Sequence, residues 1–266
     1  MAHRSSLWGD LLSRDADVAL LQEACEPPTE TKPFLDLDNE PWRTAGTKKR
    51  HWRTAIVGIN KNVNLDRITT NSIPEARDGD FGVSQLGTLA AAHVEDPNTG
   101  EVFTVVSMYA LWEKPHSSTG SGWIFADASV HRLISDISVL VGQEKGHRII
   151  ASGDLNSLYG YGEFGNKYWG GRYRTIFDRF TSIGLKFVGP QYPNGRQANP
   201  WPSELPNESL NVPTYHTNRQ TPATATRQLD FVFASSDIAD RIQVKALNSV
   251  EDWGGSDHCK IQIDVL

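Results

Sequence analysis

The chain has 266 residues, 38 % of them hydrophobic, and a formal net charge of −6 from 26 basic and 32 acidic residues. This length is enough for a substantial core, and no apolar run reaches the roughly 18 residues of a membrane span. The acidic balance disfavours tight non-specific binding to duplex DNA, because such binding depends on neutralising phosphates with Lys and Arg. It does not exclude chemistry on a phosphate, because a bound divalent cation brings its own positive charge.

Neither the N-terminal segment nor the cysteine content indicates a secreted protein. The segment MAHRSSLWGDLL lacks the apolar core of a signal peptide. The chain has two cysteines, Cys25 and Cys259, which form neither a disulfide framework nor a CxxC metal motif. A reducing cytoplasm is therefore the expected setting.

The first half of the sequence predicts one short helix followed by strands. Apolar residues at positions 7, 8, 11 and 12 indicate an amphipathic helix, and residues 17–21 predict a buried strand that ends at Gln22 and Glu23. Three β-rich runs follow, at residues 52–59, 86–94 and 102–109. The last two runs flank a turn signal at residues 96–100, so we expect them to form an antiparallel hairpin.

The second half alternates helices and strands around two long loops. Residues 110–129 are expected to form a loop, and residues 131–143 a helix with one apolar face. A second amphipathic helix is expected to carry Ile176, Phe177, Phe180 and Ile183 and to stop at Gly184. Residues 189–227 form a long loop rich in Pro, Asn and Thr. Strands are predicted at residues 148–151, 229–234, 243–247 and 260–265. This order predicts an α/β fold with a single domain over residues 1–266.

Polar side chains occur where the apolar β runs end. Glu23 follows VALLQ, Asp154 and Asn156 follow RIIASG, and the Asp257-His258 pair precedes the final strand. Carboxylates that converge on one rim provide the oxygen ligands that Mg²⁺ prefers. Asp230, inside the apolar run QLDFVF, could hold the tautomer and charge of the His258 imidazole. Taken one at a time these residues also fit solvated turns, and Tyr109 fits a core as well as a site.

Five motifs together resemble the endonuclease/exonuclease/phosphatase superfamily. They are LLQE (20–23), SMY (107–109), SGDLNS (152–157), LDFVFAS (229–235) and SDH (256–258). They occur in the order of that superfamily, which includes abasic-site endonucleases, pancreatic-type DNases, sphingomyelinases and inositol-polyphosphate phosphatases. The resemblance implies a four-layer α/β sandwich, in which two packed mixed β-sheets are flanked by helices.

The resemblance also implies a role for each matched residue. Glu23 and Asp257 match the carboxylates at a Mg²⁺ or Mn²⁺ ion. Asp154 matches the aspartate that aligns or deprotonates the attacking water, and Asn156 is its companion beside the phosphate. His258 matches the histidine at the scissile phosphate. The same comparison makes Asp230 the orienting partner of that histidine, and it places Tyr109 near the phosphate.

Two further expectations concern the start of the chain and the long loop. Members of the superfamily open with a strand whose asparagine reaches the active site, and no Asn precedes Asn39 here, so that first strand is expected to be missing. Loops before the Asp230 strand shape the substrate pocket in the superfamily. His216 and Arg219 are therefore candidate substrate contacts.

The sequence favours a Mg²⁺-dependent phosphodiester hydrolase, and a nuclease in particular, with DNA favoured over RNA. A phosphatase, or a phospholipid or phosphoinositide phosphodiesterase of the same fold, is the first alternative, because a fold does not fix a substrate. A catalytically weakened binding module is the second. Oligomeric state and the number of metal ions stay open at this point.

Overall fold

A computed structural model describes residues 6–44, 50–113, 125–142 and 147–266. Most of the predicted loop at 110–129, and the last residue of the helix predicted at 131–143, lie outside these ranges. The chain divides into two compact units. Unit 1 comprises residues 1–109 and 142–153, and unit 2 comprises residues 110–141 and 154–266.

Unit 1 begins with the predicted helix and strand. Helix α1 covers Ser6–Leu12, and strand β1, Val18–Ala24, pairs antiparallel with β2, Arg53–Gly58. The apolar face of α1 places Trp8 in a core with residues from both strands, including Leu21 and Val57. The predicted helix and strand are confirmed, but β1 is half-buried, because only Leu21 and Ala24 of its seven residues are buried.

The remaining strands of unit 1 form a sheet and a separate pair. Strands β3, Asn64–Ile68, β6, Leu89–Glu95, β7, Val102–Tyr109, and β8, Ile149–Asp154, are hydrogen-bonded neighbours in that order. Strands β6 and β7 form the expected antiparallel hairpin, and Gly100 supplies the positive φ of its turn. The sequence missed β3 and the parallel pair of β4, Thr70–Ser72, and β5, Phe81–Val83. Strands β3 and β4 carry too many polar residues for a periodic signal, and β5, with three residues, is too short for one.

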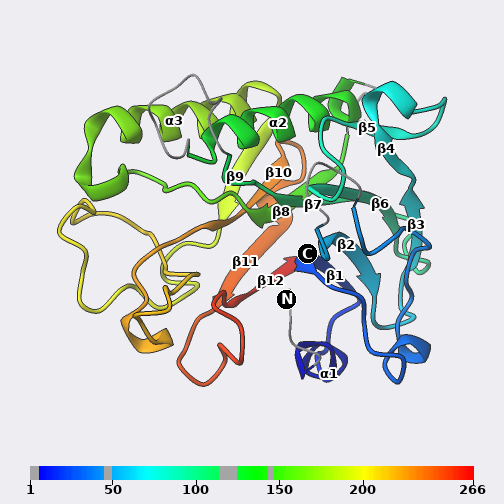
Figure 1. The fold of residues 1–266 in the computed structure, drawn as a ribbon, viewed down its shortest axis with the longest axis horizontal. Coiled ribbons are helices and arrows are strands. Elements are labelled where there is room, and N and C mark those ends of the chain that lie inside the picture. The colour runs from blue at the N-terminus through cyan, green and yellow to red at the C-terminus, as the bar shows by residue number, and fades with distance from the viewer. Residues whose placement is uncertain (1–5, 45–49, 114–124, 143–146) are drawn as a thin grey trace. The chain divides into compact units, whose positions relative to one another are not determined.

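Two helices of unit 2 lie side by side (Figure 1). Helix α2 covers Asp127–Gly142, with its last residue in unit 1, and α3 covers Lys167–Ser182. Helix α2 starts before the predicted His131, so the loop prediction was wrong for residues 127–129. Its first turn is polar but buried, because Asp127 pairs with Arg172 of α3. Asn166 caps α3, and Gly184 ends it with a φ of 84°.

The strands of unit 2 form two antiparallel pairs. Strand β9, Leu185–Gly189, pairs with β10, Asp230–Ser235, and β11, Ile242–Leu247, pairs with β12, Lys260–Val265. Aromatic rings of α3, β9 and β10 pack together, with Phe180 stacked on Phe233 at 3.8 Å. The α/β class that the sequence predicts is confirmed.

Short turns complete the fold. Turns of 3₁₀ helix occur at η1, Lys32–Phe34, η2, Ile73–Glu75, η3, Glu163–Gly165, η4, Pro222–Thr224, and η5, Ala239–Arg241. Within residues 190–227, η4 is the sole helical turn, so the long loop is confirmed. None of the described helices is long and apolar enough to cross a membrane.

Candidate functional site

Strand β8 delivers Asp154 and Asn156 into a tightly built turn. Asn156 has a φ of 46°, in the left-handed region that few non-glycine residues occupy. In unit 1, Gly153 passes so close to the backbone of Met108 that an added Cβ would lie 1.8 Å from the Met108 carbonyl oxygen. The glycine of the GDLN motif is therefore required by backbone packing one residue before the first site aspartate.

Two hydrogen bonds join Asn156 to the Asp154 carboxylate. The Asn156 backbone N–H donates to Asp154 Oδ1 at 2.8 Å, and Asn156 Nδ2 donates to Asp154 Oδ2 at 3.2 Å and to the Ala110 carbonyl at 2.9 Å. Both side chains are buried, and Asp154 is only 4 % exposed. A buried carboxylate is costly unless hydrogen bonds satisfy it, so these donors stabilise the charged form. The network fixes the direction in which the remaining lone pairs of Asp154 point.

His258 lies between two carboxylates of unit 2. Its Nδ1 is 2.8 Å from Asp230 Oδ2, and its Nε2 is 3.8 Å from Asp154 Oδ2. Asp230 opens strand β10, where its backbone N–H and that of Leu229 both donate to Thr214 Oγ1. The predicted partnership of His258 with Asp230 is therefore present in the structure.

The carboxylates change the protonation of His258. Burial lowers the pKa of His258, but the charges of Asp230 and Asp154, the hydrogen bond that His258 donates to Asp230 and the charge of Asp257 together raise it to about 10. The imidazole is consequently a cation at neutral pH in the metal-free protein. A cation in this position can stabilise negative charge on an anionic ligand.

Asp257 and the predicted substrate residues lie around this cluster. Asp257 is exposed, and its backbone carbonyl accepts a hydrogen bond of 3.0 Å from the His216 N–H. The centroid of the His216 ring lies 5.5 Å from that of the Trp253 ring, and His216 Nδ1 lies 3.0 Å from the Thr217 carbonyl oxygen. Arg219 is exposed in the turn that follows. The backbone thus joins the His216 loop to Asp257, whereas the roles of His216 and Arg219 in substrate binding stay predictions.

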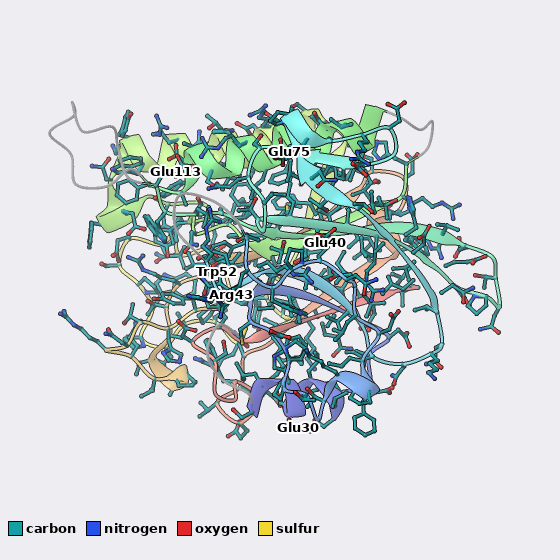
Figure 2. All side chains as sticks on the ribbon, turned by 45° about the vertical axis from the view of Figure 1, so that its right-hand side comes forward. Glu30, Glu40, Arg43, Trp52, Glu75 and Glu113 are labelled. Carbon is teal, nitrogen blue, oxygen red and sulfur yellow. The ribbon has the colours of Figure 1, made fainter. Side chains whose placement is uncertain are left out.

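Glu23 and Tyr109 form a separate pair in unit 1. The Tyr109 hydroxyl donates to Glu23 Oε1 at 2.6 Å, and Trp52, labelled in Figure 2, packs edge-on against the Tyr109 ring at 4.9 Å. The register of β1 shifts between Leu21 and Ala24, and Glu23 has a φ of 48°. A bulge of this kind re-aims a side chain at the end of a strand. Tyr109 is buried as a core residue is, and its hydroxyl meets Glu23, so its place near the phosphate stays a prediction.

In the described part of the chain, one cluster and one single carboxylate are candidates for holding a cation. Asp154, Asp230 and His258 offer ligand atoms within 4.8 Å of one another. However, His258 Nδ1 is at hydrogen-bond distance from Asp230, and a hard cation such as Mg²⁺ prefers oxygen to imidazole. We therefore interpret this set as a hydrogen-bonded acid–base cluster. The half-buried Glu23 carboxylate accepts its hydrogen bond from Tyr109 and keeps further lone pairs, which suits a carboxylate ligand of Mg²⁺.

Comparisons with known proteins give a consistent fold. No protein-family model and no curated protein sequence matches the chain. An AP endonuclease from Leishmania major has a TM-score of 0.60 at 16 % identity, covering 97 % of this chain and 81 % of that one. An AP endonuclease from Archaeoglobus fulgidus has a TM-score of 0.58 at 13 % identity, covering 97 % and 92 %. A mannosyl-6-phosphatase from Bacteroides thetaiotaomicron has a TM-score of 0.53 at 16 % identity, covering 98 % of this chain and 90 % of that one.

This chain has the endonuclease/exonuclease/phosphatase fold. The five motifs that suggested it thus fall on a backbone of the expected class, and the strand ends carry the matched residues. In unit 2 the fold brings Asp154, Asn156, Asp230 and His258 together. In unit 1 it brings Glu23 and Tyr109 together.

Within the endonuclease/exonuclease/phosphatase fold, two aromatic neighbours of the cluster were missed by the sequence. Tyr215 forms a β-bridge to His258, and its ring lies 4.9 Å from the imidazole. Burial, together with the charges of Asp257 and Asp154, raises the Tyr215 pKa. Trp112 Nε1 donates to Asn156 Oδ1 at 3.0 Å. None of the five motifs includes Tyr215 or Trp112.

Proposed function

We propose that this protein is a metal-dependent phosphodiester hydrolase, and specifically a nuclease that acts on DNA. The buried cluster of Asp154, Asp230 and His258 supports the proposal most strongly, because it pairs a potential water-orienting carboxylate with a fixed imidazolium. The fold is consistent with this activity, since solved structures that share it include AP endonucleases. We also retain the cytoplasm as the proposed setting.

Each residue of the cluster has a proposed task. Asp154 aligns or deprotonates the attacking water, since Asn156 holds the carboxylate in one orientation. His258 donates to a non-bridging phosphate oxygen and stabilises the charge that develops on phosphorus during in-line attack. Asp230 holds the imidazole and keeps it protonated. Water is the nucleophile, so no covalent enzyme intermediate forms.

A divalent cation, Mg²⁺ or Mn²⁺, is part of the proposal. Glu23 and Asp257 are the carboxylates proposed to hold it, and a bound cation would supply charge neutralisation at the phosphate. Tyr109 positions Glu23 through its 2.6 Å hydrogen bond. His216 and Arg219, in and beside the loop that joins Asp257, are proposed substrate contacts.

One alternative has specific support. The formal net charge of −6 weakens attraction to a polyanion, and one structure with this fold is a mannosyl-6-phosphatase. A phosphatase or phospholipid phosphodiesterase is therefore the second candidate. A nuclease predicts hydrolysis that falls steeply with added salt, whereas a small soluble ester predicts a shallow response.

The test is a Mg²⁺ and Mn²⁺ titration of hydrolysis, with supercoiled plasmid and bis(p-nitrophenyl) phosphate as substrates and EDTA as the blank. His258→Ala and Glu23→Gln are the test variants. His93→Ala and Glu30→Gln are matched controls, because His93 of β6 is hydrogen-bonded to Thr104 of β7 and Glu30 is exposed.

Metal-dependent hydrolysis that is lost in both test variants and kept in both controls would support the phosphodiesterase. Plasmid nicking would then decide for a nuclease. Folded protein that hydrolyses neither substrate, but hydrolyses a phosphomonoester with the same dependence on His258, would establish the alternative. Folded protein without hydrolysis of any of these esters would favour the catalytically weakened binding module.

A further inference from the structure

Four aromatic side chains of unit 2 form a continuous series that starts at Asn156. Trp112 lies 5.7 Å from Phe125, and Phe125 lies 3.9 Å from Trp169, measured between ring centroids. Tyr168 follows at 5.3 Å from Trp169. We call these four residues the aromatic ridge. Because Trp112 donates to Asn156 Oδ1, the ridge begins at the acid–base cluster and continues onto the start of helix α3.

The ends of the aromatic ridge are exposed. Trp112 is 41 % exposed and Tyr168 is 64 % exposed, whereas Phe125 and Trp169 are half-buried between them. The aromatic rings of α3 that build the core, Phe177 and Phe180, are buried on the same helix. The ridge is therefore a second aromatic surface of α3, and the buried Tyr173, whose ring lies 6.2 Å from that of Trp169, connects it to the core of unit 2.

Cations border the far end of the ridge. The Arg172 guanidinium lies 5.6 Å from the Trp169 centroid and 5.8 Å from the Tyr168 centroid, and its Nε donates to the buried Asp127 at 2.6 Å. Lys167 is exposed beside Tyr168. Both cations and Tyr168 line an open cavity of about 480 Å³ between α2 and α3. Aromatic faces with cations beside them occur in sites that bind single-stranded nucleic acid, and here the exposed Lys167 is the cation that is not ion-paired with Asp127.

We infer that the aromatic ridge stacks unpaired nucleobases of single-stranded nucleic acid whose backbone reaches the acid–base cluster. The inference rests on the proposed function and specifies its substrate class. With a net charge of −6 the chain gains little from counterion release, so affinity has to come from another source. Stacking on aromatic rings provides it and tolerates any sequence, because every base has a π-face. A duplex, whose bases are already stacked on one another, offers no such faces to the ridge.

The experiment measures binding of a fluorescein-labelled single-stranded DNA by anisotropy, in EDTA so that the oligonucleotide stays intact. A second oligonucleotide of the same length, built wholly of abasic sites, provides the phosphates without the bases. A duplex of the same sequence is the third ligand. Tyr168→Ala removes one exposed ring of the ridge and is the test variant.

Two variants serve as controls. Tyr168→Phe keeps the ring and removes the hydroxyl that accepts from Arg172 at 3.3 Å, which separates stacking from the hydrogen bond. Tyr192→Ala removes a tyrosine that is 51 % exposed and lies outside the ridge. All proteins are also assayed on bis(p-nitrophenyl) phosphate, which has no base to stack.

Tyr168→Ala is expected to bind the single strand roughly five-fold more weakly than wild type, or weaker still, because one base loses its stacking partner. Binding by Tyr168→Phe and Tyr192→Ala is expected to stay within about two-fold of wild type, because both retain the ridge rings. The abasic oligonucleotide and the duplex are expected to bind more weakly than the single strand. Equal affinities of Tyr168→Ala and Tyr192→Ala, or equal binding of the abasic and base-containing strands, would overturn the inference.

Failure of the inference and failure of the proposed function give different results. If the wild-type protein hydrolyses bis(p-nitrophenyl) phosphate with metal but does not bind the single strand, the base-stacking inference is wrong and the proposed phosphodiesterase activity stands. If the protein binds the single strand through Tyr168 but hydrolyses neither plasmid nor bis(p-nitrophenyl) phosphate, the inference about the ridge stands and the proposed phosphodiesterase activity is wrong.

Discussion

The Glu23–Tyr109 pair of unit 1 and the acid–base cluster of unit 2 place polar groups by the same backbone device. Each uses the end of a strand and a non-glycine residue in the left-handed region: Glu23, at a φ of 48°, in the pair, and Asn156, at 46°, beside Asp154 of the cluster. They differ in how the carboxylate is held. Asp154 is buried and accepts from Asn156 through both oxygens, whereas Glu23 is half-buried and accepts from Tyr109.

This difference indicates two kinds of carboxylate. A carboxylate whose lone pairs are largely occupied by protein donors keeps a fixed orientation and is suited to aligning a water or a proton. A carboxylate with fewer donors keeps lone pairs for a cation. Substitutions at the two carboxylates, and at the Gly153, Tyr109 and His258 residues beside them, can break or sharpen this contrast.

Asp154→Asn should lower kcat on bis(p-nitrophenyl) phosphate by about 10³-fold, because the variant cannot accept a proton from water. The concentration of Mg²⁺ that gives half-maximal activity should stay unchanged. Glu23→Gln should instead raise that concentration. Steady-state kinetics over a Mg²⁺ series measures both quantities, and equal shifts of the half-maximal concentration in the two variants would contradict the contrast.

Gly153→Ala should destabilise the protein by about 3 kcal/mol, because the new methyl group would overlap the Met108 carbonyl oxygen and force the backbone apart. Urea unfolding followed by circular dichroism measures the change. Gly171→Ala is the control, since a Cβ at Gly171 meets no atom within 4 Å. Similar unfolding midpoints for the two variants would show that β8 is not fixed as described.

Tyr109→Phe should raise the half-maximal Mg²⁺ concentration roughly ten-fold, because the Glu23 carboxylate loses the hydroxyl that orients it. The phenylalanine ring keeps the edge-on contact with Trp52, so stability should change little. Isothermal titration with Mn²⁺ provides a readout that does not depend on hydrolysis. An unchanged affinity for Mn²⁺ would remove Tyr109 from the positioning role.

The pH dependence of stability should report on His258. Its folded-state pKa of about 10 lies above the ordinary 6.5, so its contribution is fully present below pH 6.5 and is lost as the pH rises through about 10. In EDTA, the Tm advantage of wild type over His258→Gln should therefore shrink between pH 7 and pH 10. A constant difference in Tm across this range would show that His258 does not bind its extra proton.

The sequence itself determined the elements with strong periodicity and the motifs at their ends. The amphipathic pattern of α1, the hairpin of β6 and β7, and the order of five polar motifs predicted the α/β class and the polar residues that the structure brings together, whose catalytic roles stay predictions. These features are local, because side-chain period and turn chemistry act over a few residues. Short polar strands such as β3 and β4 gave no such signal, since neighbouring strands stabilise them.

Only the tertiary structure decided which side chains meet. Nothing local in the sequence pairs Tyr109 with Glu23, attaches Trp112 to Asn156, or aligns Trp112, Phe125 and Tyr168 into a ridge, because these partners are separated along the chain. The same holds for the first turn of α2, which is helical because Asp127 meets Arg172 of α3. Contacts between distant residues depend on how the helices and strands pack, and that packing sets both the charge of His258 and the exposure of the ridge.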